Sequence, residues 1–339
     1  MIDHFRNIVL EGGGVKGIAY VGALEVLETS GILDNVKRVG GTSAGAINGV
    51  LVGLRYTNVE IQEIMKKLDF NDFMDTSWFP GSNLFRLVTK YGWHKGDFFR
   101  EWIGGIIAEK TGSSETTFAE ATRQGKFREM SFIGTNVSTG FGRVFSYEHT
   151  PDVKIADAVR ISMSIPLFFA AKRLEGGDLY VDGGVLNNYP VKLYDREKYV
   201  IEAHQRKTEY YDGHNESLKR DNIKVSEYVY NKETLGFRVD TKKEIAAFRW
   251  GKEPEHRKTN SFASYLKAIV DTLTDSQQAS HLHTDDWHRT VFVDSLDVDI
   301  VDFDISEEKK NELIESGRKA MRDYLTWYKD PASNPINKP

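Results

Sequence analysis

Short apolar runs that end in glycine alternate along the chain with longer segments whose apolar residues recur at helical spacing. Residues 7–10 predict a short buried strand, and a glycine-rich turn follows directly. Residues 18–29 then carry apolar side chains every three or four positions, which predicts a helix closed by Gly31. A strand at residues 36–39, another glycine turn and an apolar helix at residues 46–54 repeat this order. The alternation favours an α/β fold with a mainly parallel central sheet, helices on both faces, and functional groups at the carboxyl ends of its strands.

The rest of the chain contains further regular elements and one long polar stretch. Its length of 339 residues is compatible with one large α/β domain plus an extension, or with two domains. We expect a core at residues 5–203, a polar surface excursion at residues 204–260, and a C-terminal helical extension at residues 261–330 packed on the core, followed by a frayed tail. Helices are expected at residues 58–68, 155–163, 261–280 and 307–328, and strands at residues 131–137, 143–147, 179–181, 199–203 and 290–294.

An aromatic-rich segment extends from Phe70 to Trp102. Ten aromatic residues in this span are too many for an ordinary solvated loop. One interpretation is a lid or interfacial surface that meets a bilayer, since Trp and Tyr favour the headgroup level. The other is a set of core aromatics that pack irregular helices. The aromatic residues are Phe70, Phe73, Trp78, Phe79, Phe85, Tyr91, Trp93, Phe98, Phe99 and Trp102.

Composition and charge exclude several classes of protein. The 45 basic and 50 acidic residues give a net charge of −5, which argues against nucleic acid as the main partner. There is no cysteine, which excludes disulfides, thiolate nucleophiles and cysteine-based zinc sites. The first seven residues are polar, and no apolar run reaches the roughly 18 residues that a membrane span needs. We therefore expect a cytoplasmic protein that is soluble or touches a membrane from one side.

The first motif with chemical content is Gly41-Thr42-Ser43-Ala44-Gly45, a G-x-S-x-G sequence between a predicted strand and a predicted helix. This context suits a nucleophile elbow, because the serine stands on a strained turn whose neighbours must lack bulk. The N-terminus of the following helix places positive potential near the hydroxyl. The alternative is a glycine-rich turn in which the hydroxyl only caps the helix.

The second motif is the loop Gly12-Gly13-Gly14, with Lys16 and Gly17 after it. Its backbone amides can converge on an oxyanion next to Ser43, and Lys16 is suited to steadying the loop or a phosphate. Gly12, Gly14 and Gly17 also satisfy a dinucleotide-binding fingerprint. That fingerprint needs an acidic residue at the end of the second strand, whereas the nearest one, Asp34, precedes the strand. A Walker A loop is excluded, because no Gly-Lys-Ser or Gly-Lys-Thr occurs.

Ser43 requires a base, and the sequence offers Asp182. None of the nine histidines follows a predicted core strand in a glycine-punctuated turn, whereas Asp182 does, with Gly183 and Gly184 leaving room for another segment to approach. A common Asp-Gly turn is the alternative interpretation. Because aspartate has a reference pKa of about 3.9, it can act as a base only if burial raises this pKa or the proton transfer is concerted.

A crowded stretch at His281–His288 invites a metal interpretation. Its spacing fits no zinc pattern, so we interpret it as a polar helix end. The sequence thus indicates no metal and no cofactor.

Together, the three glycine-bearing elements resemble the patatin-like phospholipase family. The order of the Gly12 loop, the Ser43 elbow and the Asp182 turn matches that family. Ser162–Pro166 is similar to the family's Ser-x-x-x-Pro segment, and Asn187–Pro190 also fits. The resemblance covers residues 7–203.

The resemblance implies a three-layer sandwich and a lipid acyl hydrolase with a Ser43–Asp182 dyad, the Gly12–Gly14 amides as oxyanion hole, and no metal. Gly41, Gly45, Lys16, Gly183 and Gly184 would support the site. The partners implied are a phospholipid or other acyl-ester substrate and peripheral membrane contact, with an activator or a second copy left open. Two alternatives stay open: a soluble carboxylesterase or thioesterase on the same scaffold, and a nucleotide-binding protein using residues 12–17.

Overall fold

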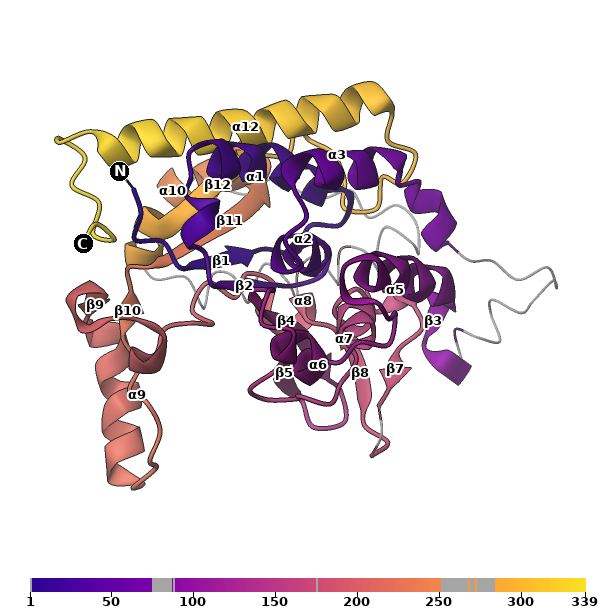
Figure 1. Cartoon of the computed structure of the whole chain (residues 1–339), viewed down its shortest axis with the longest axis horizontal. Helices are drawn as coiled ribbons and strands as arrows, with labels where there is room; N and C mark the ends of the chain where they lie inside the picture. The colour runs from indigo at the N-terminus through magenta and orange to yellow at the C-terminus, as the bar shows by residue number, and fades with distance from the viewer. Residues whose placement is uncertain are drawn as a thin grey trace.

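A mixed, mostly parallel sheet forms the centre of the computed structural model, which describes residues 2–74, 87, 89–174, 176–250, 268, 272 and 284–339 (Figure 1). Within these residues the sheet order is β12-β11-β1-β2-β4-β8-β7, with β5 paired to β4. The first five strands of this order are mutually parallel, and β5, β8 and β7 each run antiparallel to a neighbour. The strands of this sheet are β1 (Asn7–Leu10), β2 (Arg38–Gly41), β4 (Glu129–Asn136), β5 (Phe141–Ser146), β7 (Lys172–Arg173), β8 (Leu179–Asp182), β11 (Thr234–Asp240) and β12 (Thr290–Asp294).

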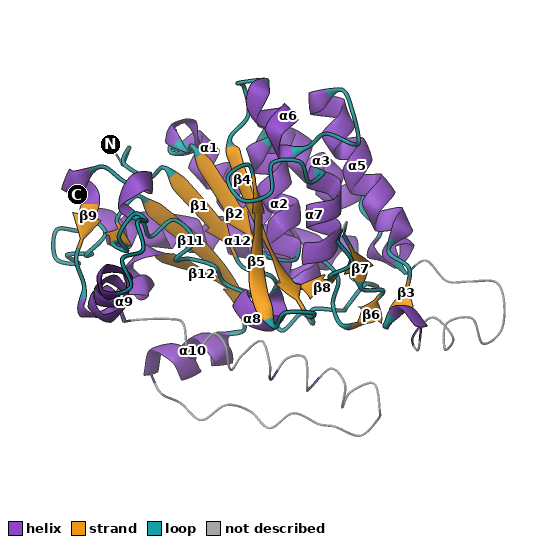
Figure 2. Cartoon of the chain, turned by 90° about the horizontal axis from the view of Figure 1, so that it is seen from below, coloured by secondary structure: helices purple, strands orange, loops and turns teal. Residues whose placement is uncertain are grey.

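Helices surround the sheet, which confirms the predicted fold class (Figure 2). α2 packs on β1, β2 and β4, α7 on β4 and β8, and α12 on β12 and α1. The helices predicted at residues 58–68, 155–163 and 307–328 are confirmed, and the one predicted at 261–280 lies outside the described residues apart from 268 and 272. The helices are α1 (Ala19–Thr29), α2 (Ala44–Gly53), α3 (Asn58–Lys67), α5 (Asp97–Thr111), α6 (Phe118–Arg123), α7 (Ile155–Ser162), α8 (Gly184–Asn187), α9 (Glu209–Arg220), α10 (Lys242–Trp250) and α12 (Glu307–Lys329).

Short elements connect these units. β3 (Gly92–His94) pairs with β6 (Leu167–Phe169), and β9 (Gln205–Arg206) pairs with β10 (Tyr230–Asn231). The predicted strand at 199–203 is wrong, because two 3-10 turns occupy this region. The 3-10 helices are η1 (Gly14–Ile18), η2 (Leu33–Asn35), η3 (Phe70–Phe73), η4 (Glu197–Tyr199), η5 (Glu202–His204) and η6 (Thr284–Arg289).

The interpretation of residues 204–260 as a surface excursion does not hold for β11. Every residue of this strand is buried, and it pairs with β1 on one side and β12 on the other. Arg238 and Asp240, which made the segment look polar, form an ion pair of 2.8 Å inside the protein. The sheet therefore takes two strands, β11 and β12, from beyond the expected core at residues 5–203.

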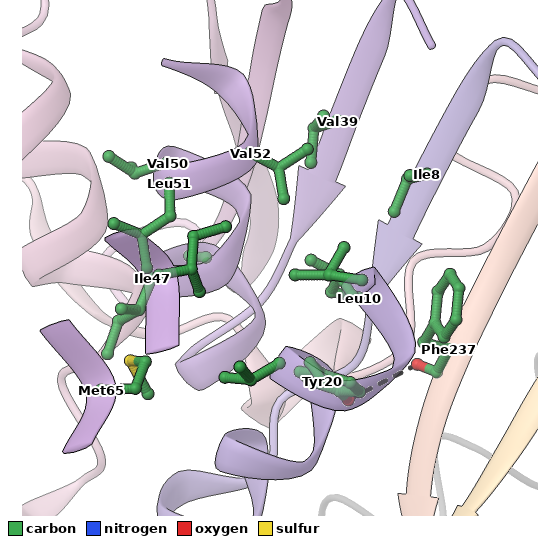
Figure 3. Packing of buried hydrophobic residues seen from close by; sticks show 14 of the residues in the cluster. Ile8, Leu10, Tyr20, Val39, Ile47, Val50, Leu51, Val52, Met65 and Phe237 are labelled. Carbon is green, nitrogen blue, oxygen red and sulfur yellow. Dashed lines mark hydrogen bonds between the residues drawn. The ribbon is translucent and has the colours of Figure 1, made fainter. Parts of the chain in front are cut away.

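Part of the apolar core lies between β1, β2 and the helices on them (Figure 3). Ile8 and Leu10 on β1 and Val39 on β2 are fully buried, and they face Ile47 and Leu51 from α2. This packing fixes α2 against the sheet, and with it the N-terminal end of α2, where Ser43 is the capping residue.

The C-terminal tail is packed, which contradicts the expectation that it frays. Asn337 is fully buried, and its carbonyl oxygen accepts a hydrogen bond of 3.0 Å from Tyr328 Oη. His4 Nε2 lies 3.1 Å from the same oxygen. Tyrosines on the last helix thus hold both ends of the chain together.

The aromatic-rich segment divides between core and surface. Phe70, Phe73 and Phe99 are buried, as the core interpretation expects. Tyr91 and Trp93 are exposed, and so is Phe98. Trp78, Phe79 and Phe85 lie outside the described residues.

Of the stretch at His281–His288, residues 284–288 are described, and they belong to the 3-10 helix η6. Asp286 is buried and forms an ion pair of 2.6 Å with Arg289, which also binds Asp195 at 2.6 Å. Asp286 thus belongs to a buried structural ion cluster. No group of three or more potential metal ligands occurs in the described part of the chain.

α1 and α12 pack so closely that only glycine fits at their contact. A Cβ on Gly317 of α12 would collide with the carbonyl oxygen of Ala19 in α1, whereas Gly105, exposed in α5, has open space around it. We expect Gly317→Ala to lower the free energy of unfolding by about 2 kcal/mol through overpacking, and Gly105→Ala to raise it by about 0.5–1 kcal/mol through helix propensity. Urea unfolding of both variants measures the change in the free energy of unfolding. Equal changes in the two variants would show that α1 and α12 do not pack this tightly.

Candidate active site

β2 and β8 bring Ser43 and Asp182 together along one edge of β4. β5 pairs with Ser131–Asn136 and so occupies the other edge of that strand. β2, which runs parallel to β4, ends opposite Phe132, and β8, which runs antiparallel, ends opposite Gly134. The carboxyl ends of β2 and β8 therefore meet roughly 7 Å apart along β4. This placement explains how residues 139 positions apart share one site.

Ser43 has the strained backbone of a nucleophile elbow. Its φ is 54° and its ψ is −125°, a conformation that non-glycine residues rarely adopt. Small neighbours make the turn feasible, because a Cβ on Gly45 would collide with the Leu10 carbonyl oxygen and one on Gly41 with Gly45 itself. α2 begins at the next residue, so the positive end of its dipole lies beside the hydroxyl.

The last residue of α7 and the two residues after it contact both predicted members of the dyad. The Ser43 amide donates a hydrogen bond of 2.9 Å to Ser162 Oγ, and the Ser43 hydroxyl lies 3.5 Å from Met163 Sδ. The Asp182 amide donates to the Ser164 carbonyl at 2.8 Å. Three consecutive residues thus fix the two strand ends relative to each other. The sequence marked this segment only as part of a motif, and assigned no role to these residues.

Burial controls the charge of Asp182. The side chain is 4% exposed, and burial raises the pKa of the carboxyl to about 7 against smaller lowering effects from the Gly184 amide and the Ser43 hydroxyl. The Gly184 amide donates to Oδ1 at 2.7 Å, while Oδ2 is buried without a hydrogen bond. This carboxyl therefore has one oxygen held in place and one able to accept a proton.

The glycine loop lies against Ser43, with Asn188 holding its first residue. A Cβ on Gly12 would come within 3.0 Å of Ser43 Cβ, so glycine is needed for this approach. The Gly12 amide donates to the Asn188 carbonyl at 3.0 Å, and Asn188 Nδ2 donates to the Gly12 carbonyl at 3.0 Å. The Gly12 amide is therefore occupied. The amides of Gly13 and Gly14 donate no hydrogen bond to the described residues, and they stay candidates for an oxyanion hole.

A buried charge cluster lies beneath this loop. Glu11 accepts a hydrogen bond of 3.1 Å from the Val239 amide and one of 3.4 Å from Asn188 Nδ2. The Arg238 guanidinium lies 3.5 Å from Glu11 and 2.8 Å from Asp240. Burial raises the pKa of Glu11, and Arg238 acts in the opposite direction. These contacts hold Glu11, the residue before the glycine loop, against β11.

The remaining predicted site residues lie near the dyad. Gly183 passes so close to β4 that a Cβ would collide with the Ile133 carbonyl oxygen, and Gly184 supplies the amide to Asp182. Lys16 is half-buried in η1, where its charge lowers the pKa of Glu11. The predicted residues are thus brought together at one end of the sheet. Asn188 and Ser162 are the contacts that sequence reasoning did not assign.

A serine on a strained turn and a buried carboxyl thus lie at one end of an α/β sheet, and comparison with known proteins places the chain in a family. A family model described as patatin-like phospholipase matches residues 8–194. The chain therefore belongs to the patatin-like phospholipase family, as its motifs predicted. Membership supports lipid acyl hydrolysis as the general activity.

Relatives agree with this assignment. The chain is 30% identical over 330 residues to the uncharacterized protein YqhO of Bacillus subtilis, a match that covers 94% of this chain and 97% of the relative. It is 26% identical over 221 residues to the probable lipid hydrolase 463L of Invertebrate iridescent virus 6, covering 60% and 66% respectively. The crystal structure of VipD from Legionella pneumophila shares the fold with a TM-score of 0.57 at 16% identity, over 95% of this chain and 67% of that one. Among the residues described, no helix has the length and apolar character needed to cross a bilayer.

Proposed function

We propose that the protein is a serine acyl hydrolase that cleaves fatty-acyl esters of phospholipids or lysophospholipids through Ser43 and Asp182. One observation carries this proposal: a serine on a strained turn stands beside a buried carboxyl whose pKa burial raises to about 7. A base with a pKa near neutrality accepts a proton at physiological pH far better than an ordinary aspartate does. No cofactor or metal enters this chemistry.

The proposed reaction has two halves. The Ser43 hydroxyl turns from Met163 Sδ toward Asp182 Oδ2, gives its proton to the carboxylate, and attacks the acyl carbonyl. The Gly13 and Gly14 amides and the N-terminus of α2 stabilise the negative charge on the tetrahedral oxygen. The ester C–O bond then breaks, and the departing alkoxide takes the proton from Asp182. In the second half Asp182 takes a proton from water, whose oxygen attacks the acyl carbonyl. The bond to Ser43 Oγ breaks, Ser43 Oγ takes the proton back from Asp182, and the fatty acid leaves.

Membership in the family supports the substrate class in this proposal. Phospholipids and lysophospholipids carry acyl esters at a bilayer surface, so the proposal includes peripheral membrane contact. Soluble carboxyl esters and thioesters are the competing substrate class, and vesicle hydrolysis separates the two.

Labelling of Ser43 tests the proposal directly. Purified protein is treated with a fluorophosphonate, and the modified peptide is identified by mass spectrometry beside Ser43→Ala. The same samples are assayed on phosphatidylcholine vesicles and on a short-chain nitrophenyl ester. We expect labelling of Ser43 and release of fatty acid. No labelling and no hydrolysis would contradict the proposal, and ester hydrolysis without vesicle hydrolysis would favour a soluble esterase.

Asn188 is expected to act as a positioning residue for the glycine loop. Asn188→Ala removes the side-chain hydrogen bonds to Gly12 and Glu11, and we expect kcat to fall by about 10²-fold because the loop amides lose their alignment. KM and fold should change little. Asn187→Ala is the matched control, since the Asn187 contact to Thr42 is made by its backbone carbonyl. Equal activity of the two variants would show that Asn188 does not align the loop.

A further inference from the structure

We propose that the small β3–β6 sheet is a docking surface for a bilayer that carries anionic lipid. This inference rests on the proposed function, because it assigns the surface by which the enzyme reaches a lipid substrate. We call this surface the β3–β6 tip and define it by Tyr91, Trp93 and Leu167, which are 48%, 41% and 39% exposed. Figure 2 shows β3 and β6 beside β7 and β8.

Two of these side chains combine an unfavourable backbone with an exposed apolar surface. Tyr91 has a φ of 62° and Leu167 a φ of 69°, in the region that favours glycine or asparagine. Gly92 pairs with Leu167, so both strained residues lie at the same end of the two-stranded sheet. Folding leaves 48% of Tyr91 and 39% of Leu167 exposed, so burial within the protein offsets the strained backbone only in part. A partner that buries these side chains supplies the compensating free energy.

The charge around the tip identifies that partner. Lys90 and Lys95 flank β3 and are exposed, and Arg173 is exposed on β7. The Ala171 amide donates to the Lys90 carbonyl at 3.1 Å, which places the start of β3 beside β7. The acidic residues of this region include Asp97, at the start of α5, and Asp178, between β7 and β8, which accepts a hydrogen bond from Asn136 Nδ2. In a chain with a net charge of −5, basic residues around exposed Tyr, Trp and Leu match an anionic lipid surface.

Arg160 fixes this tip to the catalytic segment. The Arg160 guanidinium is buried and donates to the carbonyl oxygens of Lys95, Gly96 and Ala170 on the β3–β6 side. It also donates to Ser164 Oγ at 2.5 Å, and the Ser164 carbonyl holds the Asp182 amide. A bilayer on the tip would therefore have a fixed position relative to the dyad.

Vesicle binding in a Ser43→Ala background tests the inference without lipid turnover. Full-length protein is sedimented with phosphatidylcholine vesicles with and without phosphatidylserine. The double variant Tyr91→Asn with Leu167→Asn removes two apolar side chains, and asparagine tolerates the positive φ at both positions, so the fold is kept. Binding to vesicles should weaken at least about tenfold. Lys90→Glu with Lys95→Glu should weaken binding to anionic vesicles by about tenfold or more.

The matched control is Ile223→Asn with Val225→Asn. These two apolar residues are each 50% exposed and follow α9, which lies at the opposite end of the molecule from β3 (Figure 1). We expect this control to bind as its parent does. Unchanged binding of the Tyr91 and Leu167 variant, an equal loss in the control, or no vesicle binding by the parent would overturn the inference. Fluorophosphonate labelling of the Ser43 form of each variant separates these results from a failure of the proposed function.

Discussion

Asp182→Asn should reduce hydrolysis by about 10³- to 10⁴-fold while leaving the fold intact. Asparagine keeps an oxygen that accepts the Gly184 amide but cannot take the proton of Ser43. Ser43→Ala should reduce activity at least as much, and the double variant should lose little more, because the two residues act as a unit. Single-turnover assays with the short-chain ester measure the three variants. Additive losses would show that Ser43 and Asp182 do not act as a dyad.

Asp182→Asn should also be more stable than the parent protein at alkaline pH. Burial raises the pKa of Asp182 from 3.8 to about 7, so the folded state binds this proton more tightly than the unfolded state does. The parent therefore loses stability as pH rises from about 4 to 7, and Asp182→Asn avoids this loss. We expect a stabilisation of about 4 kcal/mol above pH 7 and almost none at pH 4. Urea unfolding across this range measures the difference.

The pH dependence of activity follows from the same group. Because the base must be ionised, kcat/KM should rise with pH and level off above about 7. A profile that levels off near pH 4 would mean that Asp182 is not buried as described, or is not the base.

The turns that contain the glycine motifs were predictable, because few residue types fit their backbone geometry. A strained strand-to-helix turn needs small residues at Gly41 and Gly45, and a loop that approaches Ser43 needs Gly12. These requirements leave a visible pattern in the chain. Asp182 could be chosen over the histidines for the same reason, since its strand end is followed by two glycines.

The parts that were missed depend on contacts between distant segments. β11 pairs with β1 across more than 200 positions, and its Arg238 looks solvent-exposed until Glu11 and Asp240 are seen beside it. The hydrogen bond from Ser43 to Ser162 likewise joins two segments with no shared local pattern. Helical periodicity and turn chemistry report on neighbours in sequence, so neither feature had a local signal.

Arg238→Met should destabilise the protein by about 3–5 kcal/mol, because it leaves two carboxylates buried without their cation. The loss should be larger at pH 8 than at pH 5. Without the guanidinium, the pKa of Glu11, already raised by burial, rises further, so the ionised form is penalised more as pH increases. Thermal unfolding at both pH values measures this.

Arg220→Met is the matched control for Arg238→Met, since Arg220 pairs with Asp221 where the two side chains are 75% and 53% exposed, and such a pair contributes at most about 1 kcal/mol. Adding Glu11→Gln and Asp240→Asn to Arg238→Met should restore most of the lost stability, because neutral groups replace the uncompensated carboxylates. Activity should respond differently. Glu11 directly precedes the glycine loop and accepts from Asn188 Nδ2 and from the Val239 amide through separate oxygens. Glutamine keeps one acceptor oxygen and so loses one of these two bonds, and the triple variant should stay impaired in kcat even when its stability returns. Recovery of both together would mean that the charge cluster stabilises β11 without aligning the loop beside Ser43.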